Sequence, residues 1–142
     1  DDGLLMNPLG FTKLDNIARL YPEYGIVAAG TNNCGNPNQR FKTEDALREE
    51  PLKVAFICVY IPRTTIEKVG YMDERFVDYG YDDDDYCLRV RRAGLKIGIY
   101  DGCKINHLAL PSKFRSDGKV DIRPNQARFR EKWGKDAVEY EE

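Results

Sequence analysis

Residues 79–94 of the chain read YGYDDDDYCLRVRRAG, with four consecutive aspartates, Asp82 to Asp85, near the centre. Apolar residues at helical spacing follow the aspartates and a glycine closes the segment, so a helix is predicted from about Asp82 to Ala93. Like charges packed this closely repel one another. A sequence keeps them to hold a cation, to carry out proton chemistry, or to start a solvated helix.

The helical phase of this segment divides its residues between two faces. Tyr86, Val90 and Ala93 fall on one face, which we expect to pack against the core. Leu88 falls on the opposite face, where an apolar residue is unfavourable unless another element of the chain covers it.

The same phase divides the four aspartates into two pairs. Asp82 and Asp83 flank the core-facing stripe and are predicted to point inward or into a cleft. Asp84 and Asp85 are predicted on the outer face, where they aid solubility and Asp85 pairs with Arg89 and Arg92. A purely structural alternative stays open, because acidic residues in a first helical turn complement the helix dipole.

Helices and strands alternate on both sides of the acidic segment. Apolar periodicity and turn residues predict helices at 13–21, 43–48, 64–69 and 124–133, and strands at 25–29, 53–61, 96–100 and 103–107. The run at 53–61 is almost continuously apolar, which is typical of a strand covered on both faces. A single α/β domain over residues 1–142 is therefore predicted.

Composition excludes several classes of protein. A net charge of −2 over 142 residues favours neither nucleic acid nor an anionic membrane as a partner. No apolar run approaches the roughly 20 residues of a transmembrane helix. The four cysteines form no CxxC pair, which argues against a zinc ribbon and favours a reducing compartment. We expect a cytoplasmic protein, either free or at the membrane periphery.

Two further features contain residue types that bind cations. Asp1 and Asp2 precede the apolar residues 4–6, and adjacent carboxylates can hold a divalent cation, although the pair taken alone favours an exposed chain end. His107, the single histidine, closes an apolar strand, where either a structural or a ligand role is open.

Residues 56–63, 66–76 and 80–94 together resemble a known family. They look like the C-terminal half of the GT-A class of nucleotide-sugar glycosyltransferases, most closely the family 2 type, and the acidic stretch is also similar to the GGEDDD segment of β-galactosyltransferases. The resemblance implies a mixed sheet flanked by helices. It also implies that residues 1–142 are the catalytic and acceptor half, and that the family's N-terminal nucleotide-binding part is missing from this sequence.

The resemblance assigns catalytic roles to the inner aspartates. Asp83 would be the general base that deprotonates the acceptor hydroxyl, and Asp82 would hold the acceptor. Because Tyr81 looks like an extra residue after Gly80, the register can move by one, which would make Asp82 the base.

The resemblance also implies a donor and metal site. Asp1 and Asp2 look like the family's D-x-D element, which grips the ribose and the metal of the nucleotide-sugar. Asp2 and His107 would hold that metal, Mn²⁺ or Mg²⁺. Lys113 and Arg115 lie in the loop that closes over the diphosphate.

The expected function is an inverting, divalent-metal-dependent hexosyltransferase. It would move a sugar from a nucleotide-sugar, most plausibly UDP-linked, to a hydroxyl group of a glycan, lipid or protein, and its missing half would be present in the full protein. Two alternatives stay open. One is a non-catalytic α/β module that binds a cation or carbohydrate through the acidic cleft, and the other is a structural domain with acidic helix caps.

Overall fold

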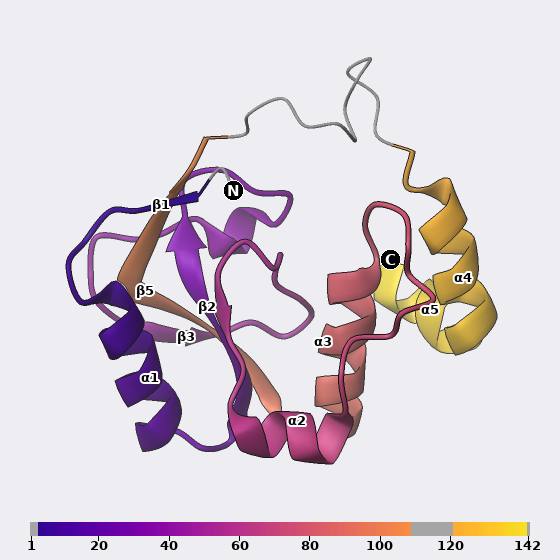
Figure 1. The fold of residues 1–142 in the computed structure, drawn as a ribbon, viewed down its shortest axis with the longest axis horizontal. Coiled ribbons are helices and arrows are strands. Elements are labelled where there is room, and N and C mark those ends of the chain that lie inside the picture. The colour runs from indigo at the N-terminus through magenta and orange to yellow at the C-terminus, as the bar shows by residue number, and fades with distance from the viewer. Residues whose placement is uncertain (1–2, 109–120, 142) are drawn as a thin grey trace.

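A computed structural model describes residues 3–108 and 121–141 of the chain. The described residues form a mixed α/β fold, with helices on both sides of one sheet (Figure 1). The strands in spatial order are β1 (Gly3–Leu5), β5 (Lys96–His107), β2 (Tyr24–Thr31) and β4 (Val59–Tyr60), and β3 (Leu47–Glu49) also pairs with β5. β2 and β5 are parallel, whereas the other pairs are antiparallel. The predicted α/β class is confirmed.

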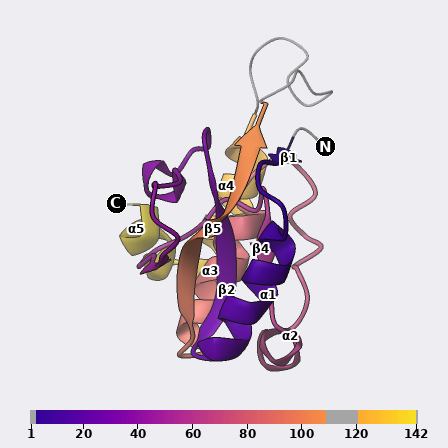
Figure 2. The ribbon, with the colours of Figure 1, turned by 90° about the vertical axis from the view of Figure 1, so that its left-hand side faces the viewer.

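β2 is the centre of the core, because all of its residues are buried. Its side chains alternate between two apolar clusters, as expected for an extended strand covered on both faces. Val27 and Ala29 pack toward α1 (Gly10–Leu20), and Ile26 and Ala28 pack toward α3 (Asp82–Arg92). Figure 1 shows α1 and α3 on opposite sides of the sheet, and Figure 2 shows β2 and β5 side by side. The sheet therefore separates α1 from the acidic helix.

β5 is one continuous strand, not the two short strands predicted at 96–100 and 103–107. Its register against β2 shifts between Ala29 and Gly30, so the predicted break at Asp101 and Gly102 is an irregularity within the ladder. The Asp101 side chain is fully buried and accepts hydrogen bonds from Arg48 at 2.6 and 3.0 Å. The irregularity thus anchors Arg48 of β3.

Gly30 in β2 has no room for a side chain. A Cβ atom there would lie 2.6 Å from the Phe41 Cβ and 2.9 Å from the Phe41 Cα. Because backbone must move to relieve this contact, Gly30→Ala is expected to lower the free energy of unfolding by about 1–3 kcal/mol. Urea denaturation measures the change. Gly35→Ala, where nothing lies within 4 Å of the added atom, is the control, and equal losses would contradict the prediction.

The strand predicted at 53–61 is mostly wrong, since only Val59–Tyr60 is β4. The backbone polar groups of the preceding residues bind side chains from the polar loop after β2. The Gln39 amide donates to the Ala55 carbonyl at 3.0 Å and accepts from the Ala55 N–H at 2.8 Å, and Asn36 donates to the Lys53 carbonyl at 2.7 Å. The apolar run indicated burial correctly. The hydrogen-bond partners of its backbone, however, are the side chains of Gln39 and Asn36 and not a neighbouring strand.

Two other sequence-based boundaries also change. The helix predicted at 43–48 is wrong, because this segment contains strand β3. Pairing with β5 and the bond from Arg48 to Asp101 outweigh a local helical preference. The short helix predicted at 64–69 is confirmed as α2 (Arg63–Val69), and the loop after β2 contains the short 3₁₀ helix η1 (Pro37–Gln39).

Two C-terminal helices cover the outer face of α3. They are α4 (Arg123–Trp133), which confirms the helix predicted at 124–133, and α5 (Lys135–Glu141), which was not predicted. Leu88 is only 7% exposed because it packs with Phe129, Ala137 and Tyr140. The cover that the position of Leu88 required is therefore supplied by α4 and α5.

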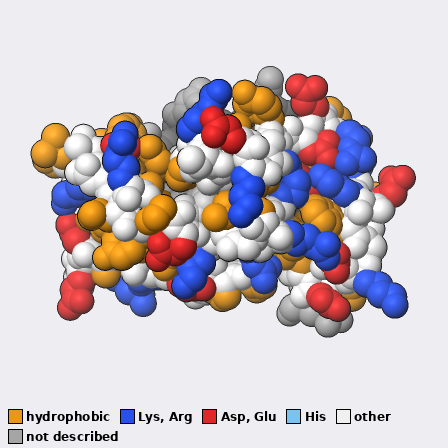
Figure 3. Space-filling model, turned by 90° about the horizontal axis from the view of Figure 1, so that it is seen from below, with side chains coloured by type: hydrophobic (Ala, Val, Ile, Leu, Met, Phe, Trp, Pro, Cys, Tyr) orange, Lys and Arg blue, Asp and Glu red, His pale blue; other side chains and the backbone are white. Residues whose placement is uncertain are grey.

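Two properties of the described residues concern binding to charged partners and to membranes. On the face seen in Figure 3, acidic and basic side chains are interspersed, so neither sign forms a continuous surface there. Within residues 3–108 and 121–141, no helix has both the length and the apolarity needed to cross a bilayer.

Candidate active site

The acidic helix begins at two residues in the left-handed backbone region. Gly80 has φ 82° and Tyr81 has φ 67°, a conformation that costs a non-glycine residue about 1–2 kcal/mol. Contacts from the C-terminal helices hold Tyr81 in place. Its hydroxyl donates to Glu141 at 2.8 Å, and its ring lies 5.3 Å from that of Phe129. α4 and α5 therefore stabilise the turn that directs the N-terminus of α3.

A cavity of about 510 Å³ lies at the N-terminus of α3. We name it the histidine cavity, because Asp82 and Asp83 of α3 line it together with His107 at the end of β5. Tyr79 lines it from the loop before α3, and Asn33 lines it from the loop after β2. Three residues predicted for the site from the sequence therefore meet at one cavity, although their roles stay predictions.

His107 is oriented by the loop after β2. Its backbone N–H donates to the Asn32 side-chain oxygen at 2.7 Å, and its Nδ1 lies 2.6 Å from the Asn33 carbonyl oxygen. A carbonyl can only accept a hydrogen bond, so Nδ1 carries the proton. In a neutral imidazole with this tautomer the lone pair is on Nε2, the arrangement that is usual for a metal-ligating histidine.

A second cavity, of about 400 Å³, adjoins the first. We name it the lysine cavity, because Lys53 lines it together with Glu50, Asp83 and Asp84, and Val54 lies among its apolar walls. Asp83 lines both cavities. Gly35 and Ala55 also line both, so Asp83 is the carboxylate at a boundary that these three residues form.

Asp83 has the environment of a proton acceptor. Burial and, after it, the charges of Asp84 and Asp82 raise its pKa to about 6, whereas hydrogen bonds from the Asp84 and Phe56 backbones oppose the shift. The Asp84 N–H donates to the Asp83 carboxylate at 2.9 Å. A carboxylate with a pKa near 6 is ionised at neutral pH and is more basic than an exposed aspartate.

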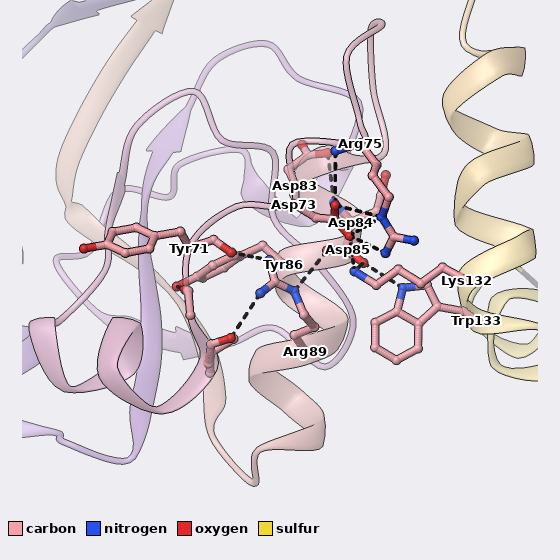
Figure 4. Close-up of polar contacts among 12 residues, drawn as sticks. Tyr71, Asp73, Arg75, Asp83, Asp84, Asp85, Tyr86, Arg89, Lys132 and Trp133 are labelled. Atoms are coloured by element: carbon pink, nitrogen blue, oxygen red, sulfur yellow. Dashed lines mark hydrogen bonds and ion pairs between the residues drawn. The ribbon is translucent and has the colours of Figure 1, made fainter.

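Asp85 belongs to a buried network of charges, in which Lys132 connects two carboxylates (Figure 4). Asp85 is fully buried and binds Arg89 at 3.0 Å, Lys132 at 2.6 Å and the Trp133 indole N–H at 2.8 Å. Lys132 also lies 2.7 Å from Asp73. Hydrogen bonds from Arg75, and then from Lys132, hold the pKa of Asp73 well below its usual range. Asp85 is thus a structural residue.

The prediction that Asp84 and Asp85 are solvated is wrong, because α4 and α5 cover them. The pairing of Asp85 with Arg89 is confirmed, whereas Arg92 pairs with Asp136 of α5 instead. The Asp84 side chain is 15% exposed and binds the Lys53 ammonium at 2.9 Å and the Tyr140 hydroxyl at 3.0 Å. Asp84 and Asp85 are therefore neutralised by ion pairs within the protein and not by water, and Asp84 shares the lysine cavity with Asp83.

The remaining residues predicted for the site, Asp1, Asp2, Lys113 and Arg115, lie outside the described residues. Gly3, which directly follows Asp2 in the sequence, pairs with His107 across β1 and β5. Within residues 3–108 and 121–141, no group of three or more His, Cys, Asp or Glu side chains is placed to hold a metal ion.

Sequence reasoning missed the contributions of Lys53, Tyr79 and Tyr140. Lys53 was assigned to a strand, and its ion pair with Asp84 has no local pattern that would reveal it. Tyr140 lies on the helix that was not predicted. Tyr79 lies three residues before Asp82, so its proximity in sequence is a usable signal for the rim of the site.

Comparison with known proteins gives one finding. Residues 56–111 match the family model described as the N-terminal domain of galactosyltransferase. This match spans α2, the acidic helix and β5, and it supports a glycosyltransferase-like domain. No curated protein and no solved structure matches the chain.

Proposed function

We propose that this chain carries the catalytic and acceptor half of an inverting, divalent-metal-dependent hexosyltransferase of the GT-A class. The donor is a UDP-sugar and the acceptor is a hydroxyl group of a glycan, lipid or protein. Asp83 is the general base, and the protein acts in the cytoplasm. The observation that carries the proposal is the position of Asp83, which lines both adjoining cavities, as expected of a base placed between a donor and an acceptor.

The proposed reaction uses the two cavities differently. The donor occupies the histidine cavity. The acceptor occupies the lysine cavity, where the carboxylates of Glu50 and Asp84 can accept hydrogen bonds from sugar hydroxyls, and it reaches past Asp83 to Asp82 at the border of the histidine cavity. Asp83 takes the proton of the acceptor hydroxyl as its oxygen bonds to the anomeric carbon of the sugar. The bond from that carbon to the diphosphate oxygen breaks, and UDP leaves with its electron pair.

The proposed divalent-metal site is based on His107 of the histidine cavity. His107 has the ligating tautomer, and its strand pairing with Gly3 brings the chain directly after Asp2 alongside it. Asp2 and His107 would hold the ion, with Asp1 beside them at the ribose and Lys113 and Arg115 at the diphosphate. When bound, Mn²⁺ or Mg²⁺ would supply the positive charge that stabilises the departing diphosphate.

Replacing His107 tests the metal site. His107→Ala is expected to raise the Mn²⁺ concentration needed for half-maximal transfer at least about tenfold, because one ligand is lost. The measurement is the initial rate of transfer against Mn²⁺ concentration. Thr64→Ala, on exposed α2, is the control and should leave this concentration unchanged. An unchanged metal requirement in His107→Ala would remove His107 from the site.

Calorimetry on the full-length protein, with UDP and Mn²⁺ titrated separately and together, distinguishes the enzyme from a binding module. The enzyme is expected to bind UDP more tightly with Mn²⁺ and to release UDP from a UDP-hexose when an acceptor is present. Metal or carbohydrate binding without such release would favour the non-catalytic alternative.

A further inference from the structure

Asp84 connects the candidate base to a lysine distant in sequence. Its backbone N–H donates to the Asp83 carboxylate at 2.9 Å, and its own carboxylate binds the Lys53 ammonium at 2.9 Å. The Tyr140 hydroxyl donates to the same Asp84 oxygen at 3.0 Å, and the Lys53 nitrogen lies 4.8 Å from the centroid of the Tyr140 ring. These contacts give Lys53 and Asp84 a defined arrangement at the wall of the lysine cavity.

The charged groups around Asp83 are mostly carboxylates. The titratable groups that face it or share its cavities are Asp82, Asp84 and Cys87 on α3, Glu50 and Lys53 before β4, Tyr140 on α5, and Cys34, Asp78, Tyr79 and His107 around the histidine cavity. Lys53 is the member of this set that is cationic at neutral pH. The Asp84 side chain is only 15% exposed, so solvent screens its charge weakly.

We propose that Lys53 is a positioning residue that acts through Asp84: by offsetting the Asp84 charge, it keeps Asp83 ionised and ready to accept a proton. The inference rests on the assignment of Asp83 as base in the proposed function. The negative charge of Asp84 favours the protonated, inactive form of Asp83, and Lys53 cancels part of that effect. Removing Lys53 and removing the Asp84 charge should therefore change Asp83 in opposite directions.

The test is the pH dependence of kcat/KM for transfer by the full-length protein. In Lys53→Met the acid limb is expected to move to higher pH by about one unit, which lowers the rate about tenfold well below that limb. In Asp84→Asn the acid limb is expected to move to lower pH. The double variant should follow Asp84→Asn, because Lys53 acts through Asp84. Lys13→Met, which removes the surface pair with Asp45, is the control and should leave the limb in place.

A pH titration of the Asp83 carboxyl carbon by NMR measures the protonation of Asp83 without requiring turnover. Opposite shifts of the titration midpoint in Lys53→Met and Asp84→Asn support the inference, and Lys53→Gln serves if the Met variant does not fold. Shifts in one direction, or no shifts, overturn it. If Asp83→Asn is inactive, such results overturn the Lys53 inference alone. If Asp83→Asn is active, the assignment of Asp83 as base and the Lys53 inference are overturned together.

Discussion

Asp83→Asn is expected to lower the rate of sugar transfer by about 10²–10⁴-fold, the usual contribution of a general base. The amide cannot take the proton of the acceptor hydroxyl, but it keeps the size of the side chain and an oxygen that can accept the bond from the Asp84 N–H. Metal-dependent binding of UDP should largely persist. The measurements are steady-state transfer rates, and calorimetry with UDP and Mn²⁺.

Asp83→Asn should lower the transfer rate but raise the stability of the fold at neutral and higher pH. The folded-state pKa of Asp83 is about 6, raised from an ordinary value of 3.8, so its contribution to stability is present below about pH 4 and lost as the pH rises through 6. Asn has no charge to bury. At pH 8 the variant is therefore expected to gain about 1–3 kcal/mol in free energy of unfolding, a gain that disappears near pH 4.

Two controls make the result on the base specific. Asp45→Asn removes an exposed carboxylate on the opposite side of the sheet and should change neither transfer nor stability appreciably. Asp82→Asn is expected to weaken acceptor binding more than the chemical step. Near-normal transfer by Asp83→Asn, together with an inactive Asp82→Asn, would assign the base to Asp82.

The second large effect is expected at Phe129, which joins the C-terminal helices to the acidic helix. Its side chain is fully buried among Leu88, Ala137 and Tyr140. Phe129→Ala should lower the free energy of unfolding by about 3–5 kcal/mol, because it leaves a cavity and removes buried apolar surface. Urea denaturation gives the free energy.

Phe11→Ala is the matched control, since Phe11 is 58% exposed and its loss should cost at most about 0.5 kcal/mol. Transfer should also fall in Phe129→Ala, because α4 and α5 cover Asp84 and Asp85 and hold the turn at Tyr81. A loss no larger than that of the control would show that these helices are not needed to support α3.

The elements predicted well are those with a local pattern in the sequence. The acidic helix, the helix ending at Trp133 and the need to cover Leu88 all follow from periodicity and from the low tolerance of apolar side chains for water. The strand prediction at 53–61 is mostly wrong because an apolar run indicates that a segment is buried, but not which groups form hydrogen bonds with its backbone. The amide groups of Gln39 and Asn36 that bind this backbone are not detectable as partners in the sequence.

In the candidate site, too, features with a local sequence pattern were predictable and contacts between distant residues were not. Asp82 and Asp83 are recognisable within the acidic run, and the strand that ends at His107 brings this histidine to the same cavity. The pair of Asp85 with Arg89 follows from helical spacing, but the contacts of Asp84 and Asp85 with Lys53, Lys132 and Tyr140 could not be predicted. These partners are far from the acidic run in sequence, and only tertiary packing brings them near it.

The buried outer pair of aspartates sets an order of events during protein synthesis. The acidic helix leaves the ribosome before Lys132, Trp133 and Tyr140 have been translated, since the chain is made from its N-terminus. Until those residues emerge, Asp84 and Asp85 lack most of their partners, and Leu88 lacks its cover. A nascent chain held at about residue 120 should therefore keep α3 loosely attached. The final shape of the acidic helix is reached only when the last two helices dock.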